Sequence, residues 1–241
     1  MIHVGIDDTD TLETRGTNQL AKVMARAVAD EYACDRIVRH QLLEDPRVPC
    51  TSKNGSASLI FRHGGPGVIE PPIAVLINRL RQIMRDDFIP GSDPGLCVAT
   101  DVGPEIIDFA QRCQQELVNR DQACDIAARN GVYLEGLGGT NDGVIGALAA
   151  VGLAAANDGG RVVQWRQWPD DLSGWQPVRV IRARDVEIRL ITSRAPVRAG
   201  TVDVGKHLRP NWRDGRCVLF VTRDMPSTER GEARWKAVRI R

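Results

Sequence analysis

The segment Ile2-His3-Val4-Gly5-Ile6-Asp7-Asp8-Thr9-Asp10 places a short apolar run directly before an acidic loop. Residues 2–6 have the length and composition of a buried strand. Three carboxylates then follow within four positions. Mg²⁺ takes oxygen ligands, and open α/β sheets bind their ligands outside the carboxyl ends of strands. Asp7, Asp8 and Asp10 are therefore candidate metal ligands and catalytic residues.

A helix is expected to follow this loop. From residue 18 to residue 32 the apolar side chains recur at helical spacing, and Thr17 follows Gly16 at the position of an N-cap. The free N–H groups and the dipole of a helix start favour an anion. Loop and helix start together predict a site for a metal ion and phosphate groups. The alternative is a polar turn in which the Asp side chains cap the backbone.

A second candidate site is the glycine-rich turn Gly136-Leu137-Gly138-Gly139-Thr140-Asn141-Asp142-Gly143. It lies between an expected strand, residues 132–134, and an expected helix, residues 144–156. Backbone amides in such a loop can approach a phosphate closely. No Gly-Lys-Ser/Thr follows, and the dinucleotide-binding fingerprint fails after Gly138. A tight turn with packing glycines is the alternative. The candidate cofactor-binding residues of this turn are Gly138, Gly139, Thr140, Asn141 and Gly143.

A third candidate is Lys53, which lies in a loop of small and polar residues ahead of an expected strand, residues 57–61. A lysine ammonium can reach a phosphate as a point charge. Lys53 is therefore a candidate catalytic residue. The alternative is an ordinary solvated lysine.

The first part of the chain alternates expected strands and helices, whereas the last part is expected to be mostly strands. Further expected helices are residues 72–84, 105–117 and 122–129, and a further strand is residues 96–99. The late strands are residues 161–165, 178–181, 186–192, 217–222 and 235–240. We therefore predict an α/β domain over residues 1–158, followed by a β-rich domain over residues 159–241.

Charge and tryptophan content also change near residues 157–160. Residues 1–160 carry a net charge of −8 and residues 161–241 one of +9, and all five tryptophans follow residue 160. A basic segment with aromatic side chains can bind an anionic substrate or a nucleic acid. The alternative is exposed arginines on strands and tryptophans in the core.

Composition points to an intracellular globular protein. The 241 residues are enough for a substantial core, and no apolar stretch approaches the roughly 18 residues of a membrane span. No basic leader precedes an apolar run, so we expect no signal peptide and a cytoplasmic location. The six cysteines are scattered without metal-ligand spacing, which favours reduced thiols over a zinc site.

Several of these segments together resemble a known family, the agmatidine synthetases that modify an isoleucine tRNA in archaea. The resemblance is strongest at Gly5-Ile6-Asp7-Asp8-Thr9-Asp10 and at Gly143-Val144-Ile145-Gly146-Ala147-Leu148-Ala149-Ala150. Arg15-Gly16-Thr17, Pro49-x-x-Ser52-Lys53, Asp93-Pro94-Gly95 and Cys217-Val218-Leu219-Phe220-Val221-Thr222-Arg223 follow in the same order.

The resemblance implies a kinase-like domain that uses ATP, in enzymes that join agmatine to a cytidine. It implies that the acidic loop holds Mg²⁺ and nucleotide phosphates and that Thr17 matches a threonine that the enzyme itself phosphorylates. Gly5, Thr9 and Gly16 would belong to the cofactor site with the glycine-rich turn.

The chain also departs from that family. Its members are longer and carry an OB-fold and a zinc ribbon, which hold the tRNA, after a ferredoxin-like second domain. This chain ends soon after residue 223 and has no zinc-ligand spacing, so we expect a short form without them. Lys53 replaces an arginine of the family, and Asp142 replaces a basic residue.

Three functions follow from this comparison. The leading expectation is an ATP- and Mg²⁺-dependent phosphotransferase or ligase that activates a hydroxyl or carboxyl group of a small molecule. A tRNA-modifying enzyme that uses the basic second domain is the alternative. The third is a module that binds a nucleotide without turnover.

Overall fold

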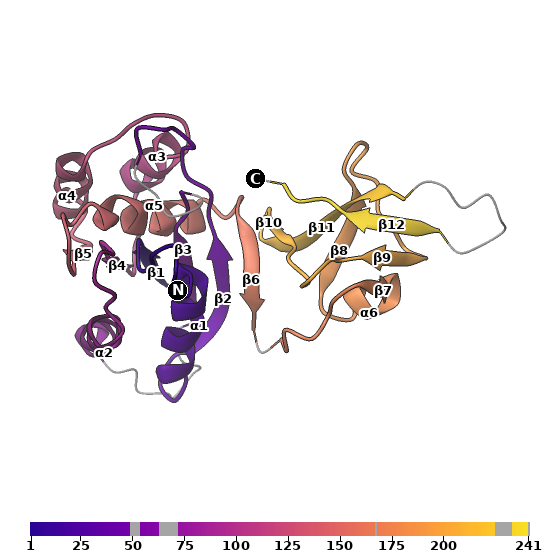
Figure 1. The fold of residues 1–241 in the computed structure, drawn as a ribbon, viewed down its shortest axis with the longest axis horizontal. Helices are drawn as coiled ribbons and strands as arrows, with labels where there is room; N and C mark the ends of the chain where they lie inside the picture. Colours follow the sequence, from indigo (N-terminus) through magenta and orange to yellow (C-terminus); the bar gives the residue numbers. More distant parts are fainter. Residues whose placement is uncertain (49–53, 63–71, 167, 225–232, 241) are drawn as a thin grey trace. The chain divides into compact units, whose positions relative to one another are not determined.

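The computed structural model describes residues 1–241 except 49–53, 63–71, 167, 225–232 and 241. The chain divides into two compact units, Met1–Ala156 and Asn157–Arg241, which are described in turn (Figure 1). Strands and helices occur in both units, so the expected mixed α/β class is confirmed. Among the described residues, no helix is long and apolar enough to cross a membrane.

The strands of the first unit pair in the order β5-β4-β1-β3-β2, and every pairing is antiparallel. Their bounds are β1 Ile2–Asp7, β2 Ala33–Arg39, β3 Ala57–Arg62, β4 Gly95–Ala99 and β5 Tyr133–Gly136. The general rule for ligand binding in open α/β sheets, on which the acidic loop was selected, therefore does not apply directly to this antiparallel sheet. In an antiparallel sheet one edge collects the ends of some strands and the starts of their neighbours.

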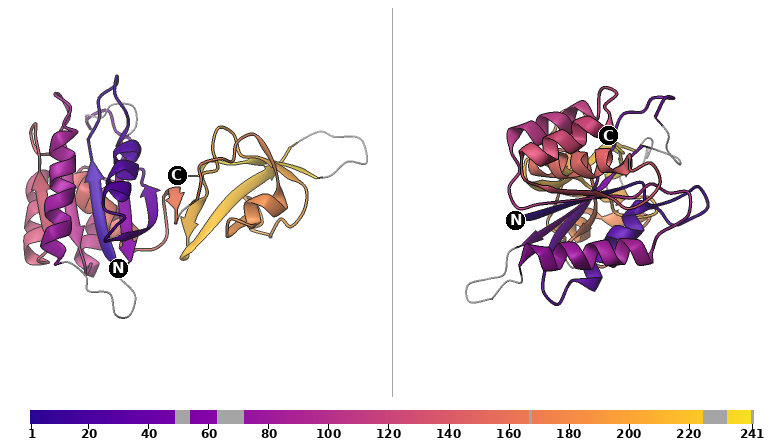
Figure 2. Two further views of the ribbon diagram at one scale, coloured as in Figure 1. Left: turned by 90° about the horizontal axis from the view of Figure 1, so that it is seen from below. Right: turned by 90° about the vertical axis from the view of Figure 1, so that its left-hand side faces the viewer.

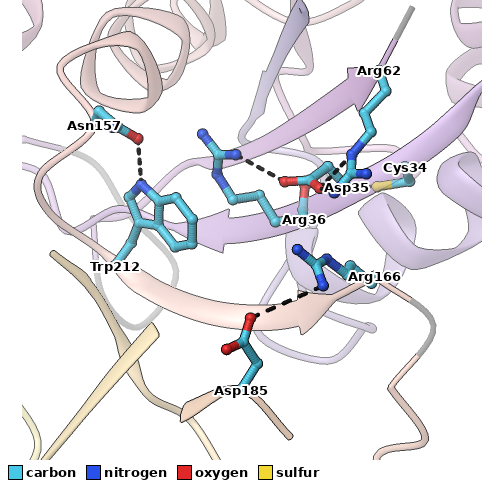
Figure 3. A network of polar contacts seen from close by, with 8 residues as sticks. All are labelled: Cys34, Asp35, Arg36, Arg62, Asn157, Arg166, Asp185 and Trp212. Atoms are coloured by element: carbon cyan, nitrogen blue, oxygen red, sulfur yellow. Dashed lines mark hydrogen bonds and ion pairs between the residues drawn. The ribbon is translucent and has the colours of Figure 1, made fainter. Parts of the chain in front are cut away.

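Strand β2 was not predicted, because its sequence carries charges where a buried strand is usually apolar. The structure shows how those charges are accommodated (Figure 3). The Asp35 carboxylate is buried and accepts hydrogen bonds from Arg36 Nη1 at 2.9 Å and from Arg62 Nε at 2.7 Å. Because paired charges cost far less to bury than isolated ones, the strand tolerates them.

Helices cover both faces of this sheet (Figure 2). Two lie on one face, α1 (Thr17–Ala27) and α2 (Ile73–Asp86), and three lie on the other, α3 (Pro104–Arg112), α4 (Arg120–Arg129) and α5 (Gly143–Ala155). The helix bounds differ from the predicted ones by one or two residues, except that two helices end about five residues early. Helix α1 ends at Ala27 and not at residue 32, and α3 ends at Arg112 and not at residue 117.

Helix α5 is the central element of the first unit. It is apolar and buried along nearly its whole length, and it packs between the sheet and α3. The close contact with β1 depends on Gly5, because a Cβ at that position would overlap the carbonyl of Ala147. The small-residue run of α5 therefore brings the helix start to the edge of the sheet where β1 ends.

The second unit contains β6 (Arg161–Trp165), β7 (Trp175–Pro177), α6 (Val178–Arg182), β8 (Val186–Leu190), β9 (Thr201–Asp203), β10 (Asn211–Arg213), β11 (Arg216–Arg223) and β12 (Arg234–Ala237). Its strands pair in the order β6-β10-β11-β12-β9-β7, and β8 pairs with β11. The pairs β8–β11 and β9–β12 are parallel, and the others are antiparallel.

Residues 178–181 were predicted as a strand and form helix α6 instead. The β-branched residues Val178 and Ile181 suggested a strand, yet they are three residues apart and both buried, which is the spacing of one helical face. Pro177 precedes them as the N-cap and fixes the backbone φ at −59°.

Two tryptophans of the second unit lie in its core and not on a binding surface. Trp165 and Trp212 are 7% and 4% exposed, and their ring centroids are 5.0 Å apart. The indole nitrogen of Trp212 donates a 2.7 Å hydrogen bond to Asn157 Oδ1 (Figure 3). The alternative of core packing therefore holds for these two residues.

Candidate active site

The acidic loop, the glycine-rich turn and the start of α5 meet at one edge of the first unit's sheet. Asp7 at the end of β1 pairs with Gly95 at the start of β4, and Gly95 pairs with Gly136 at the end of β5. Gly143 opens α5 against the carbonyl of Asp93, where a Cβ would overlap that oxygen. Segments far apart in the sequence are thus brought together by strand register.

Asp7 lies under the first turns of α5. Its carboxylate occupies the space beside Gly146, where a Cβ would overlap Oδ2. Burial, together with the charges of Asp8 and Asp10, raises the pKa of Asp7 from 3.8 to about 7. A backbone hydrogen bond at Asp8 and the charge of Arg39 act in the opposite direction. Asp7 therefore exchanges a proton near neutral pH.

Asp8 has a left-handed backbone, with φ at 48°, and its carbonyl accepts a 3.0 Å hydrogen bond from the Asp93 amide. This contact ties the acidic loop to the segment before β4. Burial and the charges of Asp93, Asp10 and Asp142 together raise the pKa of Asp8 to about 6. A cation at this position would relieve that repulsion, which is the electrostatic signature of a metal or ligand site.

Asp10 and two threonine hydroxyls form a short hydrogen-bonded chain. Thr9 Oγ1 donates to Thr17 Oγ1 at 3.2 Å, and Thr17 Oγ1 donates to Asp10 Oδ1 at 3.2 Å. Both threonines are buried. Burial raises the pKa of Asp10, although the bond from Thr17 opposes this. The hydroxyl proton of Thr17 thus faces a carboxylate that can accept it.

The expected capping role of Thr17 was wrong. Helix α1 begins at Thr17, and Gly16 is its N-cap, with no side-chain capping bond. The Thr17 hydroxyl faces Asp10 across the loop instead of its own helix start.

Asp93 is a site residue that local sequence patterns did not indicate. Its Oδ2 accepts hydrogen bonds from the Thr140 hydroxyl, from the Thr140 amide at 3.2 Å and from the Asp142 amide at 3.0 Å. Its Oδ1 is buried without a hydrogen-bond partner among the described residues. The sequence signal was the Asp-Pro-Gly run before an apolar strand.

The glycine-rich turn is organised around Asp93. The amides of Thr140 and Asp142 donate to its carboxylate, so these two are not available to a phosphate. Gly139 and Asn141 have left-handed φ values of 62° and 65°. The turn therefore positions Asp93 and the start of α5. Lys53 lies outside the described residues.

The carboxylates at this edge fit a magnesium ion that is shared with phosphate groups. Among the described residues, no three His, Cys, Asp or Glu side chains are grouped closely enough to hold a metal ion alone. Mg²⁺ usually takes only one or two protein carboxylates and completes its shell with phosphates and water. The unpartnered Asp93 Oδ1 and the mutual repulsion felt by Asp8 are what such an ion would relieve.

The chain is similar to known proteins in sequence and in fold. No protein-family model matches the chain. A curated relative, the tRNA(Ile2) 2-agmatinylcytidine synthetase TiaS of Cenarchaeum symbiosum (strain A), is 24% identical over 189 residues, which are 73% of this chain and 41% of that protein. The chain therefore spans less than half the length of the curated relative it matches.

Solved structures of TiaS show the same fold. The TiaS–tRNA(Ile2)–ATP complex aligns with a TM-score of 0.54 at 23% identity, over 63% of this chain and 36% of that one. A tRNA fluorescent labelling enzyme aligns with a TM-score of 0.53 at 22% identity, over 63% and 35%. The resemblance expected from the motifs is thus confirmed: the chain is similar to TiaS in sequence and, over 63% of its length, in fold.

Proposed function

We propose that this chain is an ATP- and Mg²⁺-dependent enzyme of the ligase type that activates an RNA substrate. The observation that carries the proposal is the meeting of Asp7, Asp8, Asp10 and Asp93 at one sheet edge. Two of these carboxylates have pKa values raised into the range of about 6 to 7. The name of the curated relative adds a tRNA substrate and an amine co-substrate.

In this proposal Asp8 holds Mg²⁺ at the end of β1, with Asp93 next to it, and the Asp10 carboxylate that accepts the Thr17 hydrogen bond serves as a base. The ion, when bound, neutralises charge on the transferred phosphoryl group. Asp7 fixes the loop against α5 through its contact at Gly146. The chain's own residues thus supply positioning and charge, which account for most of the catalysis in phosphoryl transfer. The first unit would then be the kinase-like domain.

Thr17 is the proposed phosphoryl acceptor within the chain. Its oxygen would form a bond to the γ-phosphorus of ATP as the bond to the ADP oxygen breaks. The hydroxyl proton would pass to Asp10 Oδ1, to which it already donates at 3.2 Å. This arrangement joins nucleophile and base in one hydrogen bond, as an activated hydroxyl requires.

The second unit is the proposed RNA-contacting part. Several of its exposed cations form no ion pair with a described carboxylate, among them Arg179, Arg182 and Arg198. Arg234 stacks over the exposed Trp175 ring at 4.0 Å. Such cations and stacked rings favour a phosphate backbone and bases. The earlier expectation of a small-molecule acceptor is the second candidate, and the comparisons favour RNA over it.

Salt dependence distinguishes these acceptors. We expect transfer RNA to bind with an affinity that falls steeply between 50 and 200 mM salt, because phosphate contacts release counterions. Replacing Arg179 and Arg182 together by glutamine should reduce that slope. Asp125→Asn, a charge change on exposed α4, should leave it unchanged. RNA binding without salt dependence would contradict the proposal.

A further inference from the structure

Arg39, at the end of β2, places a cation at the sheet edge that carries Asp7, Asp8, Asp10 and Asp93, which we call the acidic edge. In the sheet, Arg39 pairs with Ala57, and Ala57 pairs with Ile6, so β2 ends at the same edge as β1. Neighbouring strands are about 4.8 Å apart, which puts the backbone of Arg39 about 10 Å from that of β1. Its charge acts on Asp7 and lowers the pKa of that carboxyl against the effect of burial.

A built cradle holds the guanidinium. Arg39 Nη1 donates a 3.1 Å hydrogen bond to Gln41 Oε1. The Gln41 amide in turn donates to the carbonyls of Leu42 at 3.2 Å and Asn54 at 2.6 Å, which fixes its orientation. A Cβ on Gly55 would lie 2.9 Å from Arg39 Cζ and 2.8 Å from the carbonyl of His40. Only glycine at residue 55 leaves room for this placement.

The charge of Arg39 is partly buried and lacks a carboxylate in contact. Among the described residues, its hydrogen bond is with the neutral Gln41, and no carboxylate oxygen lies within 4.0 Å. Burial accordingly lowers the pKa of Arg39, while the more distant charges of Asp7 and Glu44 raise it. Partly burying a guanidinium without an anion is costly, so a held but unpaired arginine marks a place for one.

We infer that Arg39 contacts a phosphate group of the bound nucleotide and that Gln41 positions it. The inference rests on the proposed ATP site and adds to it a protein cation at the opposite side of the acidic loop from Asp93. A planar guanidinium suits this contact because it presents donors in fixed directions toward phosphate oxygens.

The test compares binding of ATP, ADP and adenosine, each with Mg²⁺, to the full chain by calorimetry. For Arg39→Gln we expect ATP affinity to fall by about ten- to hundredfold, as for the loss of one charge-assisted hydrogen bond, with adenosine affinity unchanged. Arg26→Gln is the matched control, because Arg26 is exposed in the last turn of α1, and it should bind ATP as the wild type does.

Arg39→Lys keeps the charge and covers the case in which Arg39→Gln does not fold. We expect it to weaken ATP binding several-fold, because an ammonium lacks the fixed planar donors. A wild-type chain that binds no nucleotide would count against the proposed function itself. A wild type that binds ATP, with Arg39→Gln or Arg39→Lys binding it equally well, would overturn the inference about Arg39 alone.

Discussion

The carboxylate of Asp7 lies in the space that a side chain at residue 146 would fill, and Gly146 leaves that space open. Strand β1 and helix α5 therefore meet at two glycines, Gly5 on the strand and Gly146 on the helix. The same small-residue run that packs the core thus holds a site residue in place.

Gly146→Ala should displace Asp7 and weaken nucleotide binding. The added methyl group overlaps the carboxylate, so strand or helix must shift, with a loss of about 1–3 kcal/mol in stability. Calorimetry should show ATP–Mg²⁺ affinity reduced at least tenfold. Gly152→Ala is the matched control on the same helix, since its Cβ would overlap the Ile106 carbonyl on α3. It should lose stability while its folded fraction binds ATP normally; equal ATP affinities in the two variants would refute this link between packing and site.

The pH dependence of stability should change in Asp7→Asn. The pKa of Asp7 is raised from 3.8 to about 7 in the folded chain, so the folded state holds a proton that the unfolded state releases. The free energy of unfolding that protonated Asp7 contributes is thus lost as the pH rises from about 4 to about 7. At pH 8 the variant should be more stable than the wild type by ~1–3 kcal/mol.

Buried histidines act in the opposite direction. Burial lowers the pKa of His3 to about 4 and that of His40 to about 3, so they favour the folded state as the pH rises toward about 6.5. The measurement is therefore the difference between variant and wild type at each pH, by denaturant unfolding. Asp125→Asn should show no such pH-dependent difference. A constant difference for Asp7→Asn between pH 5 and pH 8 would contradict the assignment.

Thr17 should carry phosphate after incubation with ATP and Mg²⁺. Its hydroxyl donates to Asp10, whereas the Thr14 hydroxyl faces its own loop at Thr11. Mass spectrometry should locate the phosphate on Thr17 in the wild type and in Thr14→Val, and should find none in Thr17→Val. Phosphate on Thr14 in the wild type would show that the hydrogen-bonded chain does not define the acceptor.

Asn157 should stabilise the second unit through the indole of Trp212. Asn157→Gly removes the acceptor but tolerates the left-handed φ of 58°, so the change isolates the hydrogen bond. We expect a loss of about 1–3 kcal/mol, as for a buried donor deprived of its acceptor. Asn157→Asp keeps an acceptor and should lose less. Unfolding followed by tryptophan fluorescence measures both, and equal stabilities would rule out a role for the bond.

Much of the first unit was predictable from local sequence. The change from apolar residues to carboxylates after Ile6 predicted both β1 and its loop, and the small-residue run after Gly143 predicted α5. Strand β2 was missed because the pairing of Asp35 with Arg62 is a contact between strands. Helix α6 was taken for a strand because its three apolar residues, Val178, Val180 and Ile181, are β-branched.

The composition of the site was only partly predictable. Asp7, Asp8 and Asp10 lie within four consecutive residues, so their sequence spacing was enough to select them. Asp93 joins them through the register of β1 with β4, and that register depends on the antiparallel sheet. Arg39 joins them through β2 and β3. Contacts of this kind depend on which strands pair, and local spacing carries no information on that.

The carboxylates of the sheet edge at Asp7, Asp8, Asp10 and Asp93 are proposed to bind ATP with Mg²⁺ and to support its turnover. The most direct test is ATP–Mg²⁺ binding and nucleotide turnover in the wild type, in Asp8→Asn and in the exposed control Asp125→Asn. We expect the wild type and Asp125→Asn to bind and turn over ATP, and Asp8→Asn to stay folded and lose turnover. Turnover in Asp8→Asn at the wild-type rate, or a wild type that neither binds nor hydrolyses ATP, would contradict this proposal.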